Sequence, residues 1–148
     1  MSLKLVVHEK IGYWGRQLPG RLANRAVRIV ESRSAEDLER ALENTISPLI
    51  VIDLGHKNCN GLEDLARALR IASDALALVI DPENRQGVSL LARELGATHV
   101  LAGIPNPPEV ADLIARWISL AQERVRSAGW EGRLPETLLS DPLAHFFQ

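Results

Sequence analysis

Short apolar runs alternate with amphipathic stretches along most of this chain. Five runs are typical of β-strands, and they span residues 3–7, 27–31, 49–53, 75–80 and 98–102. The third run, LIVID, is apolar up to its final carboxylate, as expected for a strand buried on both faces of a parallel sheet. The pattern therefore predicts five strands, with the third in the middle of a sheet.

The stretches between and after these runs have helical periodicity. Leu62, Leu65, Ala66 and Leu69 follow the i, i+3, i+4, i+7 spacing of one helix face. Ser34 is a predicted helix cap, with Asp37 three residues later as a variant capping box. A first helix is expected within residues 14–26, where Pro19-Gly20 should delay, kink or split it.

The last predicted helix has the clearest start. Asn106-Pro-Pro-Glu109 combines a capping residue, a proline at the first helical position and an acid at the third. Apolar positions continue to about residue 126, where this helix is expected to end. Gly96 is well placed to terminate the helix before it.

Strict alternation of strands and helices predicts an α/β fold. We expect a five-stranded parallel sheet with helices on both faces, which is a flavodoxin-like (βα)5 architecture. In such folds ligands bind at the carboxyl ends of the strands. We divide the chain into a domain of residues 1–126 and an apolar C-terminal extension of residues 127–148.

Composition and charge narrow the functional classes. The 148 residues, 46% of them hydrophobic, suit one folded domain, and the net charge of −2 does not favour a nucleic-acid partner. No apolar run approaches the roughly 18 residues of a membrane span, so we predict no membrane partner and a cytoplasmic location. The single cysteine, Cys59, excludes an intramolecular disulfide.

Two segments resemble the receiver domains of response regulators. In residues 49–63, the spacing from Asp53 to Asn60-Gly61 matches the spacing from that family's phosphorylated aspartate to its Asp/Asn-Gly pair. The stretch from Gly96 to Leu101, followed by Asn106 to Glu109, resembles the fifth strand and the start of the fifth helix. The resemblance covers roughly residues 3–126 and implies a receiver-like fold in two-component signal transduction.

The resemblance also implies a changed phosphorylation site. A working receiver holds a divalent cation with two acids after its first strand and with the acceptor aspartate, and it uses a hydroxyl after the fourth strand and a lysine after the fifth. This chain keeps Asp53 and has His8-Glu9 for the acid pair, Asp81 at or beside the hydroxyl position and Gly103 near the lysine position. A further carboxylate at Asp81 would repel a phosphoryl group. The implied pocket is degenerate, with members His8, Glu9, Asp53, Asp81 and Gly103.

Three functions therefore stay open. The first is a phosphorylation-independent signalling or scaffold module that acts by protein–protein contact and has no catalytic residues. The second is a small metal- or ligand-binding protein or enzyme, because Glu9, Asp53 and His56 supply the ligand types that magnesium or a transition metal takes. The third is a single-domain response regulator phosphorylated on Asp53.

Aromatic and apolar residues outside the expected core indicate partner contacts. Trp14 is expected in a loop over the site, where it could cover the pocket or anchor a partner. The extension carries an apolar set that should dock on its own domain or on a second subunit. Its predicted contact residues are Trp130, Leu138, Leu139, Phe146 and Phe147. The expected partner is another protein or a second copy of the chain.

Overall fold

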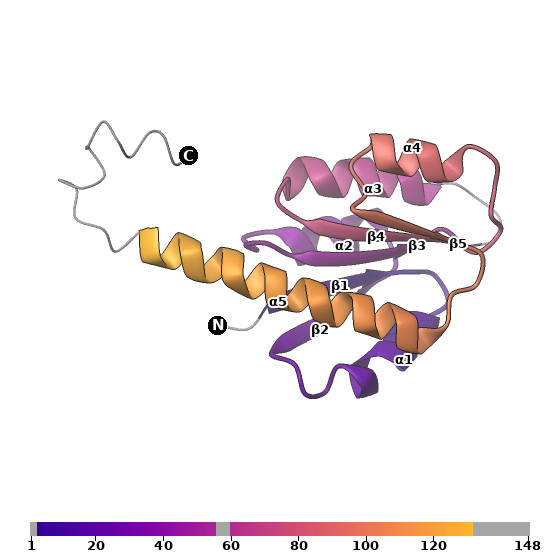
Figure 1. Ribbon diagram of the computed structural model, residues 1–148. Coiled ribbons are helices and arrows are strands. Elements are labelled where there is room, and N and C mark those ends of the chain that lie inside the picture. Colours follow the sequence, from indigo (N-terminus) through magenta and orange to yellow (C-terminus); the bar gives the residue numbers. More distant parts are fainter. Residues whose placement is uncertain (1–2, 56–59, 132–148) are drawn as a thin grey trace.

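The structure is a computed structural model that describes residues 3–55 and 60–131. Within these residues, strands and helices alternate along the chain (Figure 1). The strands are β1 (Leu3–His8), β2 (Val27–Ser32), β3 (Leu49–Asp53), β4 (Leu76–Asp81) and β5 (His99–Ala102). The helices are α1 (Tyr13–Arg21), α2 (Ala35–Leu42), α3 (Asn60–Ile71), α4 (Val88–Glu94) and α5 (Pro107–Glu131).

The strands form one parallel sheet in the order β2-β1-β3-β4-β5. This is the flavodoxin-like order, and it confirms the predicted fold. Because the strands are parallel, their carboxyl ends all reach the same edge of the sheet, which we call the carboxyl edge. Each pair of strands that are consecutive along the chain is connected through a helix, which is how parallel strands are joined.

Two apolar layers cover the sheet, one on each face. Leu49 and Val51 of β3 pack into a cluster with side chains of α1 and α5. Ile50 and Ile52, which alternate with them, pack into a second cluster with side chains of α2, α3 and α4. Successive strand residues point to opposite faces, so an uninterrupted apolar run is what a strand between two helical layers requires.

Local signals in the sequence set most helix boundaries. The Ser34 hydroxyl accepts a hydrogen bond from the Asp37 N–H at 3.1 Å, so the predicted cap of α2 is confirmed. Gly96 has a φ of +113°, the left-handed backbone that ends a helix, and it follows α4 as predicted.

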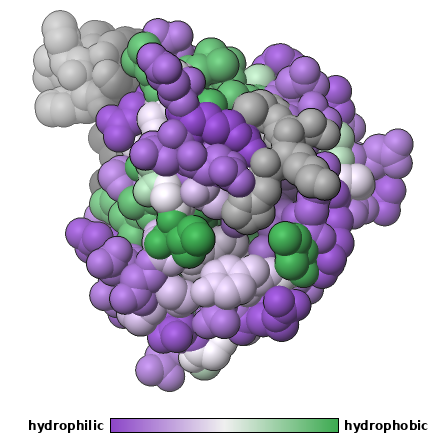
Figure 2. All heavy atoms as spheres, turned by 90° about the vertical axis from the view of Figure 1, so that its right-hand side faces the viewer, coloured by the Kyte–Doolittle hydropathy of each residue, from purple (hydrophilic) through white to green (hydrophobic). Residues whose placement is uncertain are grey.

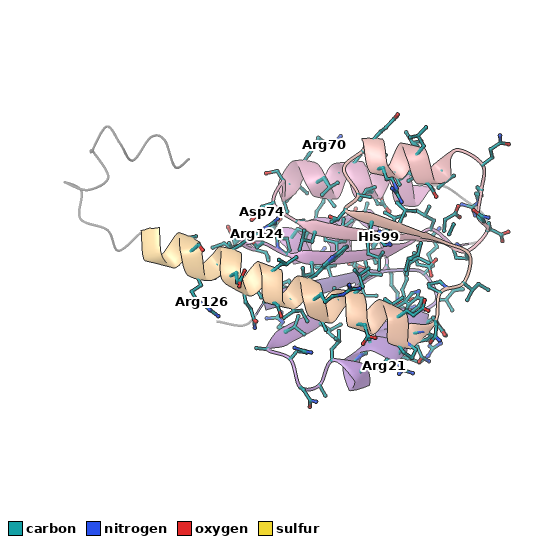
Figure 3. The ribbon with its side chains drawn as sticks, in the orientation of Figure 1. Arg21, Arg70, Asp74, His99, Arg124 and Arg126 are labelled. Atoms are coloured by element: carbon teal, nitrogen blue, oxygen red, sulfur yellow. The ribbon has the colours of Figure 1, made fainter. Side chains whose placement is uncertain are left out.

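At the edge opposite the carboxyl edge, Arg124 of α5 donates to the Asp74 carbonyl oxygen at 3.1 Å (Figure 3).

Two helices differ from their predicted extents. Pro19 does not split or delay α1, which starts at Tyr13 and runs through Pro19 to Arg21. Pro19 has no backbone N–H to donate to the preceding turn. The helix ends two residues later, so this hydrogen bond is missing only near the end of α1. Helix α5 continues to Glu131 rather than ending near residue 126, and the boundary predicted at residue 126 therefore falls inside a helix.

Several predicted site residues lie outside the described residues. They are the predicted metal ligand His56 and the predicted contact residues Leu138, Leu139, Phe146 and Phe147. Trp130 belongs to the last turn of α5 by its backbone. Among the described helices, none has the length and apolar character needed to cross a bilayer.

Candidate functional site

Asp53 ends β3 at the carboxyl edge, and both of its carboxylate oxygens accept hydrogen bonds. Oδ2 accepts from the indole Nε1–H of Trp14 at 2.9 Å. Oδ1 accepts from the Gly55 backbone N–H at 2.8 Å, which is the two-residue reach of an Asx turn. Gly55 has a φ of +69°, so glycine suits this turn. Asp53 is half-buried and is tied to its own loop and to α1.

Trp14 is not the exposed loop residue that we predicted. It is the second residue of α1, its exposed fraction is 1%, and it belongs to the core between α1, α5 and the sheet. The ring does reach the site, because its N–H donates to Asp53. Its burial leaves no surface with which to anchor a partner.

Glu9 explains why Trp14 is held in this position. Its Oε1 accepts from the Trp14 backbone N–H at 2.9 Å, and its Oε2 accepts from the Gly15 N–H at 2.7 Å. The carboxylate therefore satisfies two free donors at the start of α1 and lies at the positive end of that helix. The residue before the helix, Gly12, has a φ of +84° and offers no side-chain cap, so Glu9 takes this role.

His8 joins three elements through its two ring nitrogens. Nδ1 lies 2.9 Å from the Ser32 hydroxyl of β2, and Nε2 lies 2.8 Å from Oδ2 of Asp64 on α3. The imidazole is 6% exposed and Ser32 is also buried. Ser32 and Asp64 were missed from the sequence. The only signal was that an acid one turn into the helix after Asp53 would face the same edge.

Asp81 ends β4, and Gly103 follows the end of β5. Asp81 is fully buried, with Oδ2 accepting from the Arg85 N–H at 2.7 Å and Oδ1 lacking any partner among the described residues. Gly103 donates its N–H to the Asp81 carbonyl oxygen at 2.8 Å. Neither residue is among those that line the hollow next to Asp53, and their grouping with Asp53 stays a prediction.

A pocket of about 670 Å³ opens at the carboxyl edge. Its walls come from the loops after β1, β3, β4 and β5 and from the starts of α1 and α3. The lining includes His8, Glu9, Lys10, Ile11, Tyr13, Trp14, Arg16, Asp53, Leu54, Asp64, Ile80, Pro82, Ile104 and Pro105. Figure 2 shows this edge from the front, with separate hydrophobic groups beside paler side chains and hydrophilic groups around them.

The described side chains at this edge do not by themselves form a metal site. Magnesium takes oxygen ligands in an octahedral arrangement. Glu9 and Asp53 are the two predicted oxygen ligands among the described residues, and each accepts a hydrogen bond at both oxygens. Residues 3–55 and 60–131 contain no group of three or more side chains that could hold a metal ion. The predicted third ligand, His56, falls outside those ranges.

Comparison with known proteins identifies the fold. No protein-family model matches the chain, and no curated protein matches its sequence. A CheY-like response regulator receiver domain protein from Methanospirillum hungatei superimposes with a TM-score of 0.71 at 13% identity, covering 84% of this chain and 99% of that one. An orphan response regulator of H. pylori gives 0.65 at 19% identity, with 79% and 97% covered.

A third solved structure is a response regulator from Burkholderia pseudomallei with a phosphorylated aspartic acid, a calcium ion and citrate. It gives a TM-score of 0.65 at 19% identity and covers 90% of this chain and 76% of that one. The predicted receiver resemblance is thus confirmed for the fold. At such low identity, the chemistry of the carboxyl edge has to be argued from this chain's own residues.

Proposed function

We propose that this chain is a receiver-like signalling or scaffold module that acts by protein–protein contact and is not switched by phosphorylation of Asp53. The carrying observation is the hydrogen bond from the buried indole of Trp14 to Asp53. The likeness to response regulators over most of the chain supports a role in signalling. A protein partner or a second copy, in the cytoplasm, belongs to the same proposal.

The indole opposes phosphorylation in two ways. A carboxylate oxygen that accepts a hydrogen bond is a weaker nucleophile, and here Oδ2 accepts from Trp14 while Oδ1 accepts from Gly55. Freeing Oδ2 leaves the buried N–H of Trp14 unsatisfied, which costs about 1–3 kcal/mol. Moving the ring away would also open the core beneath it.

Two other positions of the receiver site, Glu9 and Gly103, also oppose phosphorylation of Asp53. A phosphoaspartate carries extra negative charge that needs a cation or an ammonium group close by. Glu9 is engaged by α1, and Gly103 supplies no charge where a receiver has its lysine. Of the described residues that line the hollow, Lys10 is the single lysine, and it comes from the loop after β1.

Intact mass spectrometry after incubation with Mg²⁺ and acetyl phosphate tests the proposal. The wild type should show no phosphate adduct beyond that of Asp53→Asn, while an established receiver domain in the same tube is fully labelled. An adduct that appears in the wild type and disappears in Asp53→Asn would overturn the proposal. It would make the chain a single-domain response regulator.

A further inference from the structure

We propose that the hollow at the carboxyl edge binds a small amphipathic anion, with an apolar body against Tyr13, Ile11 and Ile104 and a carboxylate or phosphate at the Arg16–Arg33 pair. This inference rests on the proposed function in one respect. If Asp53 is not phosphorylated, the hollow is free to receive a different input, and the ligand is that input.

The size and lining of the hollow suit an organic molecule. Pockets for small molecules are mostly apolar, measure roughly 300–1,000 Å³ and carry a few placed polar groups; this one measures about 670 Å³. Ile11 and Ile104, exposed by 67% and 80%, stand at its rim. Tyr13 meets Trp14 edge-on with ring centroids 4.9 Å apart. Tyr13 and the two isoleucines offer a ligand an aromatic and aliphatic surface that is otherwise in water.

Cationic groups gather at one side of the hollow. Lys10 and Arg16 line it, and Arg33 donates to the Lys10 carbonyl oxygen at 3.0 Å. A Cβ on Gly12 would lie 2.6 Å from Arg33 Nη2 and 3.6 Å from Arg16 Nη1, so the two guanidinium groups are neighbours across this glycine. Like charges so close repel each other, and an anion between them would relieve that repulsion.

The described acids at this edge form no ion pair with these cations. Glu9, Asp53 and Asp64 line the hollow, but their carboxylates are bonded to the α1 N-terminus, to Trp14 with Gly55, and to His8. Glu31 lies against Gly15. Across the described ranges, no ion pair joins Lys10, Arg16 or Arg33 to an acid. Carboxylates and cations both line the hollow. The positive charge is local to the neighbouring guanidinium groups of Arg16 and Arg33, and that side of the mouth selects an anionic head group.

Titration with 8-anilinonaphthalene-1-sulfonate provides a first probe, because it has an aromatic body and a sulfonate. We expect one probe per chain, with energy transfer from tryptophan. Competition with anionic and neutral naphthalene compounds then separates the contribution of the ligand's charge from that of its apolar body. 2-Naphthoate and 1-naphthyl phosphate should displace the probe, and the better of the two identifies the head group. Neutral 2-naphthalenemethanol should bind about tenfold more weakly or worse, which corresponds to about 1.4 kcal/mol.

Matched variants locate the site. Arg16→Gln and Arg33→Gln should each weaken 2-naphthoate several-fold and leave the neutral alcohol unchanged. Arg21→Gln, at the other end of the same helix, is the control for charge. Ile104→Ser should weaken both competitors, whereas Leu90→Ser, which removes an exposed apolar side chain of α4, should weaken neither.

Three results would overturn the inference. The first is equal affinity for 2-naphthoate and the neutral alcohol. The second is that Arg16→Gln and Arg33→Gln behave like Arg21→Gln. The third is displacement by a synthetic peptide of residues 132–148 at lower concentration than by 2-naphthoate, which would assign the hollow to the chain's own extension.

The acetyl phosphate experiment keeps this inference distinct from the proposed function. An adduct on Asp53 together with charge-dependent binding would remove the proposed function and leave an anion site. No adduct together with charge-independent binding would leave the proposed function and remove the anion site.

Discussion

Asp53 and Asp81 end neighbouring strands of one sheet, yet their surroundings differ in kind. Asp53 is half-buried, and both of its oxygens accept hydrogen bonds from Trp14 and Gly55. Asp81 is fully buried, and only Oδ2 has a partner among the described residues, the Arg85 N–H. A strand-end position alone therefore does not decide what a carboxylate does.

The difference shows that the acids around β1 and β3 belong to a hydrogen-bond network, whereas Asp81 at β4 does not. Around β1 and β3, each acid is matched to donors that also hold α1 and α3 in place. At β4, burying a carboxylate oxygen without a partner costs stability. We expect mutations in the first region to destabilise the fold, and removal of the charge at Asp81 to do the opposite.

The largest effect is expected from Trp14→Ala. The change removes a fully buried ring and leaves a cavity, so the free energy of unfolding should fall by about 3–5 kcal/mol. Urea unfolding followed by circular dichroism measures it without relying on tryptophan emission. A loss below about 1 kcal/mol would mean that Trp14 does not support the core as described.

A double-mutant cycle isolates the Trp14–Asp53 hydrogen bond. Asp53→Ala should cost about 1–3 kcal/mol, because the indole N–H loses its acceptor. In a Trp14→Phe background, which lacks the N–H, the same change should cost less. The coupling energy is expected within about 0.5–3 kcal/mol. Strict additivity would show that the two side chains do not interact in solution.

Glu9→Gln tests the cap of α1. The amide keeps only one acceptor oxygen and loses its charge, so we expect a loss of about 1–2 kcal/mol in the free energy of unfolding. Glu36→Gln is the matched control, because Glu36 is an exposed acid in the first turn of α2. That control should change stability by no more than about 0.5 kcal/mol.

The smallest effect has the opposite sign. Asp81→Asn keeps an acceptor for the Arg85 N–H and replaces a buried charged group by a neutral one. We expect stability to stay unchanged or to rise by up to about 1 kcal/mol. A loss comparable to that of Asp53→Ala would remove the contrast between the two aspartates, and chemical denaturation of both variants side by side measures it.

The fold was predictable because its signals are local and periodic. The apolar run ending in Asp53 shows a doubly covered strand, and Ser34 and Gly96 mark helix ends by rules that involve only their neighbours. The parallel arrangement of the strands then follows from the alternation of strands and helices along the chain. The end of α5 was not predictable, because after residue 126 the sequence contains no proline or strand-like run that would stop the helix at once.

The site was predictable in its position but not in its bonds. The strand ends predicted that His8, Glu9 and Asp53 lie at one edge, and all three line the same hollow in the structure. Sequence could not show that Glu9 caps α1, because that depends on the loop geometry through Gly12. That cap in turn carries Trp14 into the core and its N–H to Asp53. Partners such as Asp64 are brought to His8 only by the packing of α3 on the sheet.

The indole N–H signals in a ¹⁵N–¹H correlation spectrum test the central claim most directly. Trp14→Phe assigns the Trp14 signal, which should be protected from solvent exchange, lose that protection in Asp53→Ala and stay unmoved by Mg²⁺ with acetyl phosphate. A rapidly exchanging Trp14 N–H in the wild type would contradict the account. So would a signal that shifts when acetyl phosphate is added, since it would show Asp53 leaving the indole to accept a phosphoryl group.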